Sequence, residues 1–178
     1  MHREIEAKIL NVNPGKVQEK LRELGATLKQ ELDLEQIVWW IPNTEKRSSV
    51  RVRKASDGSL RLTMKQKVTD DLGYNEWELD VSDYENAIAV IDALLPNPEL
   101  RIEFSHHRQD WYLGGTLINI DWFPKLAPLV EIEAESEEKV REVAEQLGFS
   151  SSQLLNKGVV SLLFEELGLK IGDKVKLS

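Results

Sequence analysis

The stretch Glu4-Ile5-Glu6-Ala7-Lys8, near the start of the chain, places charged and apolar residues at alternate positions. Side chains of a β-strand point alternately to its two faces, so the three charged residues share one face at intervals of about 7 Å. Ile5 and Ala7 lie on the other face. This stretch by itself fits an ordinary solvated strand, and the rest of the chain decides whether its charged face has a further role.

The composition predicts a single folded domain over residues 1–178, since 41% hydrophobic residues can build a sizeable core. The absence of cysteine excludes disulfides, a thiolate metal site and a cysteine nucleophile. No apolar run approaches the roughly 20 residues that span a bilayer, and no signal-peptide pattern is present, so we expect a soluble, cytoplasmic protein without a membrane partner. The net charge of −8 argues against DNA as a partner. The oligomeric state stays open, a homodimer included.

Local signals predict eight strands and four helices along the chain. After the N-terminal strand, the other strands are expected at about Thr27–Ile41, Ser49–Ala55, Leu60–Val68, Asn75–Val81, Leu100–Tyr112, Thr116–Phe123 and Leu129–Glu135. The helices are expected after an Asn13-Pro14 start, after a Ser82-x-x-Glu85 capping box, from Ser136 to Leu147, and over about Ser152–Leu167. Nearly all of the connections allow antiparallel neighbours.

Charged and apolar residues alternate in strand after strand, and the charges are sorted by sign. The third and fourth strands carry basic residues on this face and the fifth and eighth carry acids: Arg51, Arg53, Arg61, Lys65 and Lys67 against Glu76, Glu78, Asp80, Glu131, Glu133 and Glu135. The amphipathic helices need the apolar strand face, so the charged face must be open to water. It is either the exposed side of a flat sheet or the inside of a closed barrel, and closure would also remove sheet edges. Sorting by sign favours ligand binding over plain solvation.

Five tryptophans belong to the apolar part of this pattern. Trp77 and Trp122 alternate with acidic residues, so we expect them to pack under helices. Core or rim positions are expected for Trp39, Trp40 and Trp111.

The ligand chemistry that fits this pattern is a polyanion bound together with a hard divalent cation. Arginine and lysine side chains bind phosphate oxygens, which predicts a substrate grip made of Arg51, Arg53, Arg61, Lys65 and Arg108. Mg²⁺ or Mn²⁺ prefers carboxylate oxygens, which predicts a metal site at Glu4, Glu6, Glu131 and Glu133. Zinc has poor candidates, because adjacent strand residues such as His106 and His107 point to opposite faces.

These residues, in this order, resemble the CYTH family, also called triphosphate tunnel metalloenzymes. The resemblance rests on Glu4-x-Glu6-x-Lys8, Arg51-x-Arg53, Thr63-x-Lys65, Glu76-x-Glu78, Arg108, Asp121 and Glu131-x-Glu133, and it covers nearly the whole chain. It implies an α+β, mostly β fold: an eight-stranded antiparallel barrel, or tunnel, with a charged interior and flanking helices. It also implies a small-molecule substrate bearing a triphosphate, and a divalent cation to which Asp121, Glu76 and Glu78 contribute. The family includes thiamine triphosphatases, inorganic tripolyphosphatases, RNA triphosphatases and class IV adenylate cyclases.

Some positions differ from the family's pattern. Tyr74 and His106 stand where the family often has basic residues, and Ser49 stands near the arginine pair, where thiamine triphosphatases place a tryptophan. The last helix lacks the tyrosine that is common there.

We expect hydrolysis of a triphosphate, with Glu4, Glu6 and Lys8 as the catalytic group. Lys8 would orient the attacking water or bind the terminal phosphate. The alternatives are a class IV adenylate cyclase, which makes cyclic AMP and pyrophosphate from ATP, and a non-catalytic polyphosphate or nucleotide binder. No stretch of sequence indicates an adenine pocket, so tripolyphosphate is expected to be cleaved at least as well as ATP.

Overall fold

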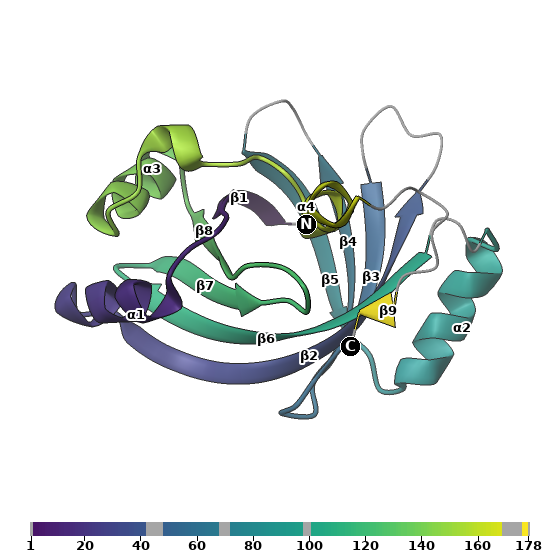
Figure 1. The fold of residues 1–178 in the computed structure, drawn as a ribbon. Coiled ribbons are helices and arrows are strands. Elements are labelled where there is room, and N and C mark those ends of the chain that lie inside the picture. The colour runs from purple at the N-terminus through teal and green to yellow at the C-terminus, as the bar shows by residue number, and fades with distance from the viewer. Residues whose placement is uncertain (1, 42–47, 68–71, 98–100, 169–175, 178) are drawn as a thin grey trace.

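The computed structural model describes residues 2–41, 48–67, 72–97, 101–168 and 176–177, which form a closed antiparallel barrel (Figure 1). The barrel order is β2-β3-β4-β5-β1-β8-β7-β6, and β6 pairs with β2 to close the sheet. The predicted eight-stranded barrel is therefore confirmed, and a two-residue strand, β9 (Lys176–Leu177), adds to it in parallel beside β6. The eight strands are β1 (His2–Ile9), β2 (Thr27–Ile41), β3 (Ser48–Ala55), β4 (Leu60–Lys67), β5 (Gly73–Asp80), β6 (Arg101–Leu113), β7 (Thr116–Trp122) and β8 (Leu129–Ala134).

Two helices begin at the residues that the sequence indicates. The Asn13 side chain accepts a hydrogen bond from the Lys16 N–H at the start of α1 (Pro14–Glu23), and Pro14 occupies the first helical position. The Ser136 side chain accepts from the Lys139 N–H at the start of α3 (Glu137–Gln146).

The start of α2 (Tyr84–Leu94) differs by one residue from the prediction. Its N-cap is Asp83, not Ser82, and the Asp83 carboxylate accepts from the Asn86 N–H at 2.9 Å. A carboxylate at this position satisfies the free N–H and also favours the positive end of the helix dipole.

The last predicted helix is wrong in its first half. Ser151–Gln153 form only a short 3-10 turn, and α4 begins at Val159 and ends at Leu167. Between them, the Leu155 backbone exchanges two hydrogen bonds with Lys8 of β1, at 3.0 and 2.8 Å. Pairing with the part of β1 that lies beyond its pairing with β5 satisfies these backbone groups in an extended conformation, so Leu155 is not part of a helix.

The register brings the charged residues of neighbouring strands onto one face. Glu6 lies opposite Glu133 and Lys8 opposite Glu131, while Lys65 lies opposite Glu76. The residues between these charged positions point to the opposite face of the sheet, and the helices pack against them. The charged face is thus the inside of the barrel, and the choice between a flat sheet and a tunnel is settled.

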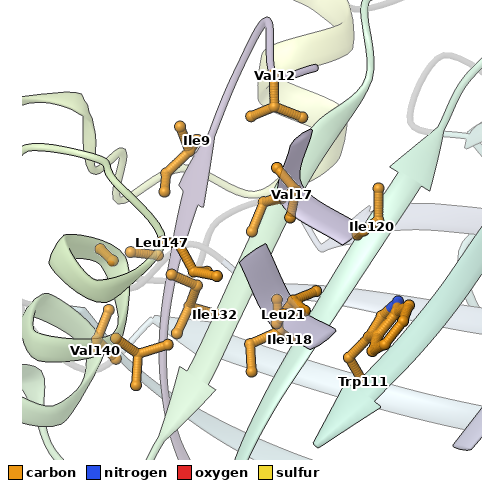
Figure 2. Close-up of a cluster of buried hydrophobic side chains, with 14 of the residues drawn as sticks. Ile9, Val12, Val17, Leu21, Trp111, Ile118, Ile120, Ile132, Val140 and Leu147 are labelled. Atoms are coloured by element: carbon orange, nitrogen blue, oxygen red, sulfur yellow. The ribbon is translucent and has the colours of Figure 1, made fainter. Parts of the chain in front are cut away.

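The apolar outer face forms the main core. Figure 2 shows how side chains of α1 and α3 pack onto the outer face of β1, β6, β7 and β8. Leu21, Ile118, Ile132 and Val140 are fully buried there, and each such side chain stabilises the fold by about 1.5–3 kcal/mol. On another side of the barrel, α2 covers β2 and β3 (Figure 1). Among the described residues, no helix is long and apolar enough to span a membrane.

The tryptophans divide between core and surface. Trp39 and Trp111 are buried, and Trp122 packs against the cluster of Figure 2. The prediction for Trp77 is wrong, because its side chain is 37% exposed on the outer face of β5. The described helices pack on the strands to either side of β5, so this strand keeps part of its apolar face in solvent.

Candidate active site

The tunnel interior collects the charged residues that the sequence singled out. Lys65 is its centre: the Nζ atom lies 2.6 Å from Glu4 Oε2, 2.9 Å from Glu6 Oε2 and 3.2 Å from Glu76 Oε2. Three carboxylates from β1 and β5 therefore share one ammonium group of β4. Burial lowers the pKa of Lys65, but the surrounding carboxylates outweigh it and hold the pKa well above its ordinary value.

A second lysine continues this network along β1. Lys8 Nζ lies 2.6 Å from Glu6 Oε1 and 2.6 Å from Glu131 Oε2, and its side chain is almost fully buried. Burial opposes the charge on Lys8, yet Glu131 and Glu6 raise its pKa above the ordinary value. Likewise, burial would raise the pKa of Glu6, but Lys65 and Lys8 hold it well below its ordinary range. Lys8 and Glu6 are therefore charged at neutral pH, and Lys8 can donate protons in hydrogen bonds but cannot accept one.

The network contains more negative than positive groups. Burial, together with repulsion from Glu76 and Glu133, raises the pKa of Glu4 to about 8 despite its contact with Lys65. Burial and repulsion, first from Glu131, raise the pKa of Glu133 to about 7. The Glu4 Oε2 and Glu76 Oε2 atoms are buried and have no partner in hydrogen-bonding geometry among the described residues, although both lie within ion-pair distance of Lys65. The site is therefore short of positive charge.

A hard divalent cation fits this deficit. The donor set consists of carboxylate oxygens, which Mg²⁺ and Mn²⁺ prefer. In the described part of the chain, no three acidic or histidine side chains are spaced as ligands of one ion. Lys65 and Lys8 lie between the carboxylates, so metal binding requires at least one ammonium group to move aside.

Asp121 has a different environment from the other predicted metal ligands. Its oxygens accept two hydrogen bonds, each of 2.7 Å, from Nε and Nη2 of Arg108. The His106 Nε2 atom lies 3.3 Å away, outside hydrogen-bonding geometry. Burial would raise the pKa of Asp121, but Arg108 and His106 lower it well below its ordinary range. This bidentate pair fixes the orientation of the Arg108 guanidinium, so the role of Asp121 in this structure is to position Arg108.

His106 does not supply the positive charge of the basic residue that the family often has at this position. Its side chain is buried and its ring stacks on Phe123 with centroids 4.3 Å apart. Burial lowers the pKa of His106, although Asp121 opposes that shift. Its neighbour His107 faces outward, where it contacts Glu31 and Asp33. The expectation that the two rings point to opposite faces is confirmed.

The arginines divide into an inner and an outer group. Arg51, Arg53 and Arg108 line the same cavity, and burial with repulsion from the other two lowers the pKa of Arg53 to about 10. Arg61 is further out: it pairs with Glu78 at 2.6 Å, and its side chain is 41% exposed. Arg61 and Glu78 are not among the described residues that line the cavity.

The cavity has a volume of about 650 Å³ and also holds residues that the sequence did not indicate. Gln36, Trp40 and Phe104 enter it from β2 and β6, and Asn156 with the first turn of α4 borders it. These residues lie outside the alternating charged pattern. Strand parity was the one signal for Gln36, Trp40 and Phe104, and without the register it could not be connected to the site; Asn156 and α4 had no such signal.

Comparison with known proteins agrees with this architecture. A protein of Pyrococcus horikoshii OT3 superposes with a TM-score of 0.78 at 23% identity, over 89% of this chain and 98% of the other. A putative adenylate cyclase from Vibrio parahaemolyticus gives 0.71 at 14% identity, over 90% and 97%. A putative adenylyl cyclase from Hippeastrum, described as having a dominant triphosphatase activity, gives 0.60 at 14% identity, over 96% and 97%. At these identities the likeness shows the fold alone.

Sequence comparison gives the family. No curated protein sequence matches the chain, but the family model for the CYTH domain matches residues 2–159. That range contains all of the paired charged residues that face the tunnel. The chain therefore belongs to the CYTH domain family.

Proposed function

We propose that this protein is a divalent-metal-dependent triphosphatase. The proposal rests on one observation: basic side chains that can bind phosphate lie next to carboxylates that can bind a divalent metal. Three arginines and four lysines, which suit phosphate oxygens, line this cavity together with Glu6 and Glu131, two members of the carboxylate cluster that is short of positive charge. A triphosphate together with a divalent cation satisfies both halves of this site.

The basic residues would bind the phosphate chain. Arg51, Arg53 and Arg108 present guanidinium groups that suit bidentate contacts with phosphate oxygens. Asp121 would hold Arg108 in its orientation throughout the reaction. The mutual repulsion that lowers the pKa of Arg53 would be relieved when an anion binds among these cations.

The carboxylates Glu4, Glu6, Glu131 and Glu133 would hold the metal, with Glu76 beside them. When bound, Mg²⁺ or Mn²⁺ neutralises phosphate oxygens and so favours attack on phosphorus. Glu78 and Asp121 already contact arginines, and we assign them to orienting those arginines.

Lys8 would act as a donor at the terminal phosphate. Its ammonium group stays charged, so it stabilises the leaving or attacking oxygen through hydrogen bonds and takes no proton. A water that attacks the terminal phosphorus forms one P–O bond while the bond to the bridging oxygen breaks, so the rest of the substrate departs with the electron pair on that oxygen, and both protons of the water stay on the orthophosphate that is formed. A putative adenylyl cyclase of Hippeastrum with a similar fold has a dominant triphosphatase activity, which favours hydrolysis over cyclisation here.

One incubation tests the reaction type. The purified protein with Mg²⁺ or Mn²⁺ receives tripolyphosphate, thiamine triphosphate or ATP, and orthophosphate, pyrophosphate and cyclic AMP are separated. We expect orthophosphate as the first product, and we expect its formation to stop when a chelator removes the metal. Cyclic AMP as the main product from ATP would make the protein a class IV cyclase. Metal-dependent binding without turnover of any triphosphate would make it a silent binder.

A further inference from the structure

Helix α2 is apolar on the side that faces solvent as well as on the side that packs on the barrel. Ile88 and Ile91 are buried against β2 and β3. The exposed apolar residues of the helix, which we call the α2 patch, are Ala89, Val90, Ala93 and Leu94. The exposed residues of α1 and α3 are mostly charged, whereas Glu85 is the one charged residue among those fully exposed on α2. A helix that is apolar all round is normally buried on all sides.

The outer face of β5, next to α2, carries none of the described helices. In the β4–β5 register Trp77 lies opposite Met64, and Leu79 lies opposite Leu62. All four point outward, because they alternate with residues that face the tunnel. Trp77 and Leu79 are exposed, and the two residues of β4 are half-buried. We call these four residues the β4–β5 patch.

The α2 patch and the β4–β5 patch lie side by side. The opposite edge of α2 is held by Asp92, which accepts a hydrogen bond of 2.8 Å from Trp39 Nε1 of β2 and lies 3.5 Å from Arg101 Nε of β6. At 3.6 residues per turn, Val90 and Leu94 each lie about 160° around the helix from that position. They therefore point toward β4 and β5, which follow β3 in the sheet order. The helix stands above the sheet, so the two patches form an apolar step.

We infer that this step binds a second copy of the chain, with the α2 patch of each copy on the β4–β5 patch of the other. One twofold axis between α2 and β5 makes both contacts at once, so the assembly closes as a dimer. Each copy then supplies the helix that the partner's β5 lacks. Ala89 and Ala93 lie one turn apart, and their small side chains let α2 approach the partner's sheet closely. The inference does not depend on the proposed enzymatic function.

The size of the step fits a dimer. The exposed fractions are 37% for Trp77, 63% for Leu79, 57% for Val90 and 70% for Leu94. Since a fully exposed large side chain presents about 150–250 Å², these four contribute roughly 350–550 Å² of apolar surface. A standard interface buries about 800 Å² per partner, of which about 500 Å² is apolar. The step therefore supplies the apolar area that a stable dimer needs.

Charge argues against a lipid membrane as the occupant. Helices that lie on membranes carry Lys and Arg beside their apolar face, whereas the charged residues of α2 are Glu85 and Asp92. The net charge of −8 adds repulsion from anionic lipid. The residues of the two patches are uncharged, so two copies meet there without repulsion between like charges.

Sedimentation velocity of the full chain between about 1 and 100 µM tests the inference, and the wild-type protein should sediment as a dimer. Leu94→Glu on α2 and Leu79→Lys on β5 should each raise the dimer dissociation constant about thirtyfold or more, as expected for a central interface residue. Both positions are exposed in one copy, so thermal melts should show a folded monomer. Leu28→Glu, at an exposed apolar position of β2 outside both patches, is the matched control and should leave the dissociation constant unchanged.

A mixture of the two variants tests the reciprocal arrangement. In the mixed dimer one contact pairs the new carboxylate with the new ammonium group, and the other contact keeps both wild-type leucines. The mixture should therefore dimerise at concentrations at which each variant alone is monomeric. A mixture that stays monomeric, variants that dimerise like the wild type, or a wild-type monomer at 100 µM would each overturn the inference. A wild-type monomer that binds phosphatidylglycerol vesicles would assign the step to a membrane instead.

Discussion

Replacing Lys65 by methionine should make the stability of this protein depend on metal. Met keeps nearly the length of the lysine side chain but removes the ammonium group that contacts Glu4, Glu6 and Glu76 at 2.6, 2.9 and 3.2 Å. Without metal, three buried carboxylates then face one another with no shared cation. With metal, a divalent cation can restore the missing charge in the same place.

The size of the effect follows from the burial of the cluster. Removing one partner of a buried ion pair costs about 3–5 kcal/mol, because the remaining charge is left uncompensated. In a chain of this length each kcal/mol lowers the melting temperature by about 2–4 °C, so a loss of roughly 10 °C is expected in chelator. Part of this loss is avoided below pH 8, where Glu4, whose pKa is raised to about 8, is protonated.

Thermal unfolding of wild-type protein and Lys65→Met at pH 8, in EDTA and in millimolar Mg²⁺ or Mn²⁺, measures this dependence. Metal should recover most of the loss in Lys65→Met and should raise the melting temperature of wild-type protein much less. Lys54→Met, at an exposed position of β3, is the control and should change neither value. An equal loss with and without metal would refute the idea that Lys65 and the cation share one carboxylate cluster.

Three further predictions concern the same network. In chelator, the melting temperature of wild-type protein should fall by a few degrees as pH rises from about 5 to 8. In this window Glu4 and Glu133 keep protons in the folded state that the unfolded chain, with a carboxyl pKa of 4.5, has released; a flat profile would contradict the raised pKa values. Glu133→Gln should abolish metal-dependent turnover with little loss of stability. Glu6→Gln should abolish turnover and also lower the free energy of unfolding by about 3 kcal/mol, because it leaves Lys8 and Lys65 undercompensated. Product assays and circular dichroism melts measure the two effects, and retained turnover in either variant would contradict this prediction. Lys8→Ala should lower kcat more than it raises KM if Lys8 acts at the terminal phosphate during the reaction, and steady-state kinetics that move KM alone would assign it to substrate binding.

Strand alternation and family resemblance were sufficient to predict much of this protein. A period of two is a local property, so Glu4, Glu6 and Lys8 could be placed on one face without knowledge of any partner strand. Turn and cap signals located the strands to within a few residues and located two helix starts, at Asn13 and Ser136. The largest error in the helices fell where a non-local contact prevails, in the pairing of Leu155 with Lys8 that delays α4.

The contacts within the tunnel were beyond the sequence because they depend on closure and register. Three strands, β1, β4 and β5, bring Lys65 among three carboxylates, and the pairing of β6 with β7 decides that Asp121 is held by Arg108. The apolar part of the cavity lining, which includes Trp40, is assembled from two strands, the residue after β7 and a helix, so no single stretch of sequence carries its pattern. The sequence by itself determined which residues are charged and which strand face they share. The tertiary structure alone decided their distances, and with them the pKa values and contacts, since electrostatic energies depend on separation and burial in space.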